Sequence, residues 1–273
     1  MPDSPYSSQV TKTWADFLAG TDRCAHAVQI YADLDELADS VATYLARGFD
    51  VGEPAILVAT ADHAGCFLER LAAEGWDAVR IERDAFLRVE DADATLAAIM
   101  QGGRSPSRPV FEQIVGGLLD DAEARAPGRE VRAFGEMVDL LSERGATRAA
   151  VELEDLWNDL GRRRRFSLLC GYHLDVFDRA SQVGTLPDVC RAHSHVLPAS
   201  NSARLARSVD LALEEVLGPA EAGKVYAMVG EQIRRGRVPS PQLVLMWVSA
   251  NMPALADRIL ASARTRYLDA LPA

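Results

Sequence analysis

The chain has 273 residues, enough for one α/β domain and a smaller helical domain. Its 40 acidic and 29 basic side chains give a net charge of −11, which argues against a general affinity for nucleic acid or for anionic membranes. No apolar run has the length of a membrane span, and the first residues do not have the pattern of a signal peptide. Four cysteines without paired spacing are typical of a reducing compartment, so we expect a cytoplasmic protein.

The first recognisable unit covers residues 27–59. An apolar run at 27–31 predicts a strand, and leucine and valine then recur at helical spacing over 34–45. Glycines and a proline separate this helix from a second apolar run at 55–59. The pattern is a strand, a helix and a parallel strand, which is the unit in which nucleotide-binding α/β folds carry their phosphate loop.

The turn after the first strand nevertheless lacks the residues of a phosphate loop. Such a loop is rich in glycine and ends in Gly-Lys-Ser/Thr, because backbone amides and the lysine hold the phosphates. Here we expect Asp33 to cap the helix and Glu36 to complete a capping box, so a phosphate would meet like charge. The two lysines of the chain, Lys12 and Lys224, both lie outside this turn.

Residues 218–225 match the spacing of a phosphate loop up to the last position, where Val225 replaces the hydroxyl residue that would hold magnesium. The residues before this match, 205–217, have helical rather than strand periodicity, and Gly218-Pro219 favours a helix stop. We therefore interpret the match as a coincidence.

Further strands and helices alternate along the chain. We predict helices at 62–74, from a cap at Asp91 or Asp93 to 100, at 111–125 and at 148–160, with a loop at 102–109. Strands are expected at 85–89, 131–137 and 166–172. This alternation predicts an α/β fold, with a mainly parallel sheet covered by helices on both faces.

The last third of the sequence has a different pattern. From residue 186 onward no strand is convincing, and residues 202–217, 221–235, 241–250 and 253–271 read as helices separated by glycine and proline. We expect an N-terminal segment (1–20), an α/β domain (21–197) and an all-helical C-terminal extension (198–273).

Candidate ligand-binding residues follow the predicted strands, because an open parallel sheet binds ligands at the carboxyl ends of its strands. The sequence places there Tyr31, Thr60 with His63, Glu136 with Met137, and Tyr172 with His173. These groups suit a small, mostly apolar ligand with one polar handle rather than a phosphate. The candidate set also contains His26, Gln29 and Trp157.

Several of these residues have a structural alternative. Glu136 either faces a ligand or pairs with an arginine such as Arg132 or Arg165. Trp157, at helical spacing with leucines, is more often a core residue, and His26 is more often a hydrogen-bonded structural histidine. Tyr31 is the strongest single candidate, because it lies at the turn that a nucleotide would occupy.

Patterns for metal binding and catalysis are weak. Cys24-x-His26 and Cys190-x-x-His193-x-His195 offer sulfur and imidazole ligands, but the two pairs lie far apart and neither has the spacing of a familiar zinc site. The sequence has no Gly-x-Ser-x-Gly motif, and no cysteine lies in an evident reactive turn. We therefore expect no metal, no cofactor and no catalytic residues.

Three segments carry a resemblance to a known family: Val131-Arg-Ala-Phe-Gly-Glu-Met-Val138, Leu153-Glu-Asp-Leu-Trp-Asn158 and Phe166-Ser-Leu-Leu-Cys-Gly-Tyr172, which follow His26-x-x-Gln29-x-Tyr31. Together they resemble the MEDS family, named for a sensory domain of methanogens and of a methylotroph's dichloromethane-responsive regulator. The resemblance covers about residues 22–197, and His173 departs from it where proline is expected. The family is related to the RecA and KaiC ATPases but lacks their phosphate loop, and the helical extension resembles a continuation common in its stand-alone members.

The resemblance implies a non-enzymatic sensory module in signalling or transcriptional regulation. We expect it to bind a small organic effector and to contact a signalling protein through the helical extension, with no direct nucleic-acid or membrane partner and with a homo-oligomer as one possible state. One alternative is an interaction scaffold that docks a kinase, a sigma-factor regulator or another copy of itself. A residual nucleotide-binding protein is the least favoured alternative.

Overall fold

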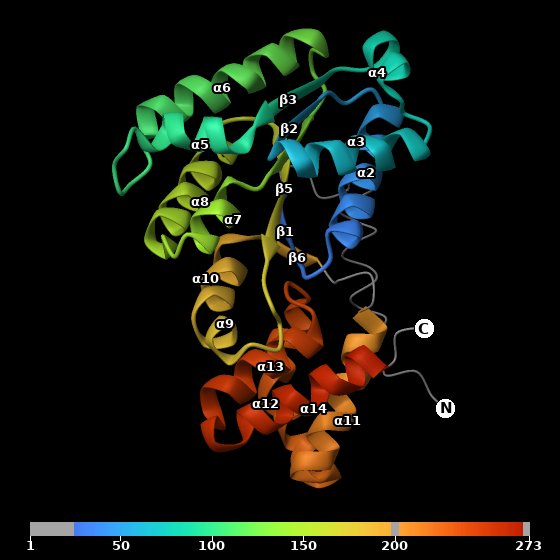
Figure 1. The fold of residues 1–273 in the computed structure, drawn as a ribbon, viewed down its shortest axis with the longest axis vertical. Coiled ribbons are helices and arrows are strands. Elements are labelled where there is room, and N and C mark those ends of the chain that lie inside the picture. The colour runs from blue at the N-terminus through green and yellow to red at the C-terminus, as the bar shows by residue number, and fades with distance from the viewer. Residues whose placement is uncertain (1–24, 198–201, 270–273) are drawn as a thin grey trace. The chain divides into compact units, whose positions relative to one another are not determined.

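The computed structural model describes residues 25–197 and 202–269 (Figure 1). These residues divide into two compact units at Leu174. We refer to residues 25–173 as the sheet unit and to residues 174–269 as the helical unit. The sheet unit contains five of the strands, and the helical unit consists mainly of helices.

The sheet unit is built on parallel strands. They are β1 (His26–Tyr31), β2 (Ala55–Ala59), β3 (Leu87–Asp91), β4 (Val131–Gly135) and β5 (Phe166–His173). They lie in the order β3-β2-β4-β5-β1, and each pair of neighbours is parallel. Every residue of β1, β2 and β4 is buried, as in a sheet that is covered on both faces. The predicted parallel α/β fold is thereby confirmed.

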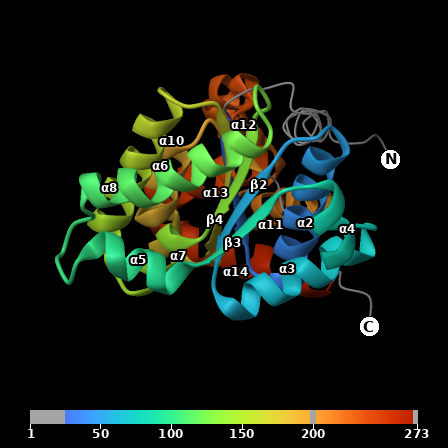
Figure 2. The ribbon, with the colours of Figure 1, turned by 90° about the horizontal axis from the view of Figure 1, so that it is seen from above.

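Helices cover both faces of this sheet. They are α2 (Leu34–Asp50), α3 (Ala61–Ala73), α4 (Ala78–Asp84), α5 (Ala92–Met100), α6 (Arg108–Arg125), α7 (Met137–Glu143) and α8 (Thr147–Gly161). Figure 2 shows α2 and α3 on one side of the strands and α5 to α8 on the other. Connections between strands therefore cross over through helices, as parallel pairing requires.

Alternation along the strands divides the core into two layers. On the side of α2 and α3, the Phe134 ring meets Phe67 edge-on with a centroid distance of 5.1 Å. Gly171 belongs to the same layer, because a Cβ atom there would lie 3.2 Å from Leu37. On the opposite side, Trp157 packs edge-on against Phe111 with their centroids 5.1 Å apart. Two apolar layers of this kind supply the main driving force for folding of the unit.

A buried arginine closes the amino end of β4. The Arg132 side chain is 3 % exposed, its Nε donates to Glu53 at 2.6 Å and its Nη1 donates to the Tyr44 carbonyl at 2.8 Å. Gly48 leaves the space for it, because a Cβ at that position would lie 2.5 Å from Arg132 Cδ. Paired in this way, the charge can be buried at tolerable cost.

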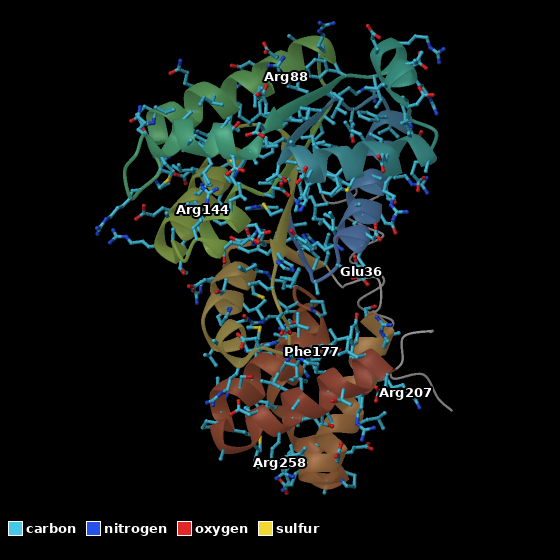
Figure 3. The ribbon with its side chains drawn as sticks, in the orientation of Figure 1. Glu36, Arg88, Arg144, Phe177, Arg207 and Arg258 are labelled. Atoms are coloured by element: carbon cyan, nitrogen blue, oxygen red, sulfur yellow. The ribbon has the colours of Figure 1, made fainter. Side chains whose placement is uncertain are left out.

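The helical unit consists of α9 (Arg179–Val183), α10 (Thr185–Ala192), the short strand β6 (His195–Leu197), α11 (Ser202–Leu217), α12 (Pro219–Arg235), α13 (Ser240–Asn251) and α14 (Pro253–Asp269). Its apolar core joins α11 to α14, and Phe177, labelled in Figure 3, packs against that core. A buried amide pair links α9 to α13, where Gln242 donates to Gln182 at 3.0 Å. No helix of the described residues is long and apolar enough to cross a membrane.

Two predicted features of the secondary structure are wrong. The strand expected at 131–137 ends at Gly135, because Glu136 leaves the extended conformation (φ −123°, ψ 10°) and α7 begins at Met137. A strand, β6, also occurs in the region where none was expected, but it has only three residues. The helices α4, α7, α9 and α10, with five to eight residues each, were not predicted because they are too short to show a periodic pattern.

Candidate functional site

The connection from β1 to α2 contains only two residues, Ala32 and Asp33. Asp33 is extended, and its carboxylate accepts a hydrogen bond from the Asp35 amide at 2.9 Å, which confirms the predicted N-cap. A glycine-rich phosphate loop needs about eight residues whose amides turn toward the ligand. The first turn therefore has the length and charge of a capped helix start, not those of a phosphate-binding loop.

Glu136 follows β4 and is the centre of a first group at the carboxyl edge of the sheet. It is 2 % exposed, its Oε1 accepts from the Thr60 amide and its Oε2 lies 2.7 Å from His63 Nδ1. Thr60 directly follows β2, and His63 lies in the first turn of α3 with 27 % of its side chain exposed. The partner of Glu136 is thus a histidine rather than Arg132, which pairs with Glu53 instead.

A second buried carboxylate, Asp139 on α7, connects the two neighbouring strands β1 and β5. Its Oδ2 accepts from the Tyr31 hydroxyl at 3.1 Å, and its Oδ1 accepts from the His173 amide at 2.9 Å. Burial is the main cause that raises the pKa of Asp139 to about 6, and the Glu143 and Glu136 carboxylates raise it further. Burial and the Asp139 charge also raise the pKa of Tyr31, so the phenol remains protonated and donates.

These residues form what we call the carboxyl-edge cluster: Tyr31, Thr60, His63, Glu136, Asp139 and His173. The Tyr31 and His173 rings have their centroids 5.3 Å apart. Two carboxylates, two imidazoles and a phenol can exchange hydrogen bonds with a polar group of a ligand, and Asp139 changes its charge near pH 6. Sequence reasoning missed Asp139, because its helix of seven residues was not predicted.

His26 and Tyr172 belong to a different group, which we call the thiol cluster: His26, Glu154, Asn158, Cys170 and Tyr172. His26 Nε2 lies 3.3 Å from Cys170 Sγ and 3.3 Å from Glu154 Oε2. Tyr172 donates to Glu154 Oε1 at 2.9 Å. Burial raises the pKa of the Cys170 thiol and of the Glu154 carboxyl above their usual values. Cys24, which the sequence analysis paired with His26 as a potential metal ligand, lies outside the described residues.

The remaining candidate residues are buried. Met137 is 1 % exposed, and Trp157 packs between Phe111 and Phe166, which is the core position that its helical spacing favours. Gln29 is also 1 % exposed, and neither its amide nitrogen nor its amide oxygen has a hydrogen-bond partner in the part of the chain that the structure describes. These three residues are therefore buried inside the sheet unit rather than exposed on its surface.

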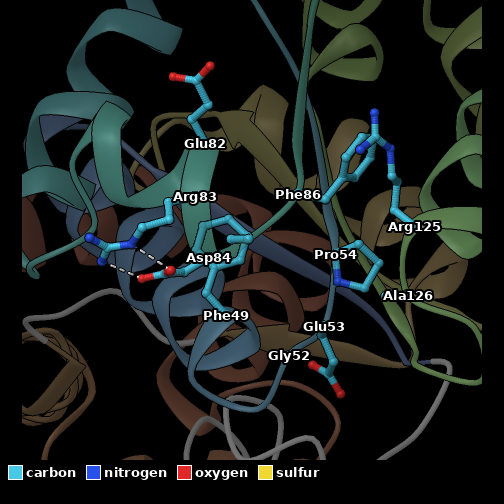
Figure 4. Close-up of a pocket in the computed structure, with 11 residues that line it drawn as sticks. Phe49, Gly52, Glu53, Pro54, Glu82, Arg83, Asp84, Phe86, Arg125 and Ala126 are labelled. Carbon is cyan, nitrogen blue, oxygen red and sulfur yellow. Dashed lines mark hydrogen bonds and ion pairs between the residues drawn. The ribbon is translucent and has the colours of Figure 1, made fainter.

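A pocket of about 330 Å³ opens at the opposite, amino end of the sheet (Figure 4). Its walls come from Pro54 and Phe86, which precede β2 and β3, and from the end of α6. Charged side chains surround it, and Arg83 pairs with Asp84 at 2.6 Å. Sequence analysis predicted no ligand at this end, because the general rule for parallel sheets places ligands at the carboxyl ends of the strands.

A family model for the MEthanogen/methylotroph, DcmR Sensory domain matches residues 25–194. The chain belongs to the MEDS family. The match begins with β1 and extends through α10, so it contains both clusters of the sheet unit as well as α9 and α10 of the helical unit. No curated protein matches the chain. Membership in this family marks the chain as a sensory module of a signalling system.

Proposed function

We propose that this MEDS chain is a non-enzymatic sensor that binds a small organic effector at the carboxyl-edge cluster. The sensory role comes from the family match, and the choice of site rests on one observation. Two buried carboxylates, three residues apart in the sequence, bind groups from four elements of the sheet unit. Glu136 binds the Thr60 amide after β2 and the His63 imidazole on α3. Asp139 binds the Tyr31 hydroxyl on β1 and the His173 amide on β5.

The polar group of an effector would enter through the exposed rim of the cluster. His63 has 27 % and His173 has 53 % of its side chain exposed. A donor on the effector that replaces His63 at Glu136 would release α3 from the end of β4, and one that replaces Tyr31 at Asp139 would release β1 from α7. Binding energy of this kind can shift the protein between two conformations only if the effector prefers one of them.

The chemistry of the cluster favours binding over catalysis. Its members contain no serine or cysteine, and the hydrogen bonds from Tyr31, the Thr60 amide and the His173 amide all end on carboxylates rather than on a base that activates a nucleophile. The short acidic turn after β1 argues against a phosphate ligand, so we expect isothermal titration calorimetry to show no ATP binding at millimolar concentration. Heat of binding that saturates with ATP would contradict this part of the proposal.

A ligand screen on the purified full chain tests the site. The probes are dichloromethane and short-chain alcohols and amides, and the readout is the midpoint of thermal unfolding. We expect at least one probe to raise Tm saturably, and we expect His63→Ala and Asp139→Asn to abolish that rise. Arg83→Ala, in the amino-end pocket, is the matched control and should retain it.

Two outcomes would overturn this assignment. If Arg83→Ala or Phe86→Ala abolished the rise and the carboxyl-edge variants retained it, the effector site would be the pocket at the amino end. If no probe raised Tm and mass spectrometry of the freshly purified chain found no bound organic species, the sensor would lack an effector at this cluster.

We place the contact with a signalling protein partner on the helical unit, because α11 to α14 follow the range that the family model matches. A pull-down with the full chain as bait, with and without Tyr31→Ala, tests this output. A partner that responds to the variant supports a sensor, whereas a partner that binds equally well to both forms supports the alternative of an interaction scaffold.

A further inference from the structure

A second site with different chemistry lies in the thiol cluster, and its residues come from three elements of the sheet unit. His26 is the first residue of β1, Cys170 lies on β5 and Glu154 lies on α8. Parallel pairing sets His26 opposite Leu168, so Cys170 is two residues further along β5 on the same face. All three residues are buried: His26 is 9 % exposed, Glu154 is 2 % exposed and Cys170 is 1 % exposed.

The donor atoms of these three residues are close to one another. His26 Nε2 lies 3.3 Å from Cys170 Sγ and 3.3 Å from Glu154 Oε2, and all three donor atoms lie within 4.8 Å of one another. Zinc binds nitrogen and oxygen at about 2.0–2.2 Å and sulfur at about 2.3 Å, so its tetrahedral ligands are about 3.3–3.6 Å apart. The two separations from His26 Nε2 lie at the lower end of that range, and the third, between Cys170 Sγ and Glu154 Oε2, is no more than 4.8 Å, so the three donor atoms are close enough to share one ion.

Neighbouring side chains orient two of the donors. Asn158 Oδ1 lies 3.0 Å from His26 Nδ1, and an Nδ1 proton donated to this oxygen leaves the imidazole lone pair on Nε2, the nitrogen nearest Cys170 and Glu154. Tyr172 donates to Glu154 Oε1 at 2.9 Å, so Oε2 is the oxygen that lies beside His26. Hydrogen bonds of this kind commonly orient metal ligands from behind.

The three ligands also match zinc in charge and hardness. A thiolate and a carboxylate together balance a divalent cation, which lowers the cost of burying all of these charges. A set of sulfur, imidazole and one carboxylate suits zinc, whereas calcium and magnesium require oxygen ligands. We propose that His26, Glu154 and Cys170 bind one zinc ion inside the sheet unit, at a site separate from the carboxyl-edge cluster.

Binding requires one proton to leave. The S–H bond of Cys170 breaks as the zinc–sulfur bond forms, and the proton passes to the buffer while the metal remains divalent. The ion would tie the first residue of β1 to α8 and to the middle of β5. Sequence spacing gives no sign of this site, because its ligands lie 128 and 16 positions apart along the chain.

Cobalt(II) is the probe for this site, because a cobalt–thiolate bond gives a charge-transfer band in the near ultraviolet. The full chain, free of any affinity tag and treated with a chelator and a reductant, is first checked for folding by circular dichroism. Titration with CoCl₂ should produce the band and saturate at one equivalent, and one equivalent of ZnCl₂ should then remove it. A folded wild-type chain that gives no saturable band overturns the proposal, whatever the variants do.

Variants assign the ligands. Cys170→Ser should abolish the band, whereas Cys24→Ser, Cys66→Ser and Cys190→Ser are matched controls that should keep it. Glu154→Gln should weaken cobalt binding at least tenfold, and Asn158→Ala should weaken it by about 10- to 100-fold through the lost support of His26. A band that persists in Cys170→Ser, or that disappears in one of the control variants, contradicts the assignment. These readouts are independent of any organic effector, so they do not test the proposed sensor function.

Discussion

The two ends of the parallel sheet differ in how they treat charge. At the amino end, a pocket of about 330 Å³ is surrounded by charged side chains, and the buried Arg132 is held by Glu53 and the Tyr44 carbonyl. At the carboxyl end, Glu136 and Asp139 are buried among a histidine, a tyrosine and backbone amides. Among the described residues, the open pocket therefore lies at the amino end of the sheet, whereas the carboxylate with the raised pKa, Asp139, lies at the carboxyl end.

In this protein, the open pocket and the carboxylate that responds to pH lie at opposite ends of the sheet. At the amino end, the Arg132 guanidinium is held by the Glu53 carboxylate and by the Tyr44 carbonyl, so this end offers a buried ion pair. Asp139 titrates near pH 6, so the carboxyl end changes charge within the physiological range. The variants below separate a structural role of the amino end from a responsive role of the carboxyl end.

The largest effect is expected at the amino end from Arg132→Met. The change leaves the Glu53 carboxylate and the Tyr44 carbonyl without their bonds to the guanidinium, and removal of one partner of a buried pair costs about 3–5 kcal/mol of unfolding free energy. Urea denaturation followed by circular dichroism measures the loss. Arg83→Met, whose pair with Asp84 is on the surface, is the control and should leave the denaturation midpoint unchanged.

The next effect is a pH dependence at the carboxyl edge. Because the pKa of Asp139 is raised to about 6 in the folded state, its contribution to stability is full below about pH 3.8 and is lost as pH rises through about 6. Wild type should therefore lose roughly 2–3 kcal/mol relative to Asp139→Asn between pH 4 and pH 7. Urea denaturation of both proteins at several pH values measures the difference, and parallel curves across this range would refute it.

A smaller loss is expected from Gly48→Ala. The added methyl group would lie 2.5 Å from Cδ of the buried Arg132 side chain, and such overpacking costs about 1–3 kcal/mol. Gly65→Ala on α3 is the matched control, because a Cβ there meets no atom within 4 Å and should stabilise the helix by about 0.5–1 kcal/mol. Equal effects of the two variants on thermal unfolding would mean that Arg132 moves aside at no cost.

The smallest effect is expected from Tyr31→Phe. Loss of the hydroxyl removes one of the hydrogen bonds that lower the pKa of Asp139, so we expect that pKa to move further up. The cost should be about 1–2 kcal/mol at pH 7.5, where wild-type Asp139 is charged, and should be smaller at pH 5. Urea denaturation at these two pH values measures the cost, and an equal cost at both would show that Tyr31 acts through packing alone.

Sequence patterns predicted the parts of the fold that are long or locally determined. The apolar runs of β1, β2 and β5 and the amphipathic pattern of α8 identify those elements, and Asp33 caps α2 as expected. The rule that strand ends share one edge correctly predicts that Thr60, His63 and Glu136 lie together, although they come from separate parts of the chain.

Other features depend on contacts that no local pattern contains. Asp139 reaches Tyr31 and the His173 amide only because Glu136 ends β4 and starts a seven-residue helix. His26 and Tyr172 meet through Glu154 rather than at the carboxyl edge, because strand register and helix packing, not spacing, bring them together. The pairing of Arg132 with Glu53 likewise depends on tertiary packing rather than on their spacing in the sequence.

The two-residue turn between Tyr31 and Leu34 also limits how this protein can be re-engineered. A nucleotide site could not be introduced there by point substitution, since replacing residues with glycine and lysine would not add the backbone length that surrounds a phosphate. An insertion of several residues would have to replace the Asp33 cap and would displace Tyr31 from Asp139. Control of this chain by ATP is therefore easier to build through a fused or bound ATPase than through its own first turn.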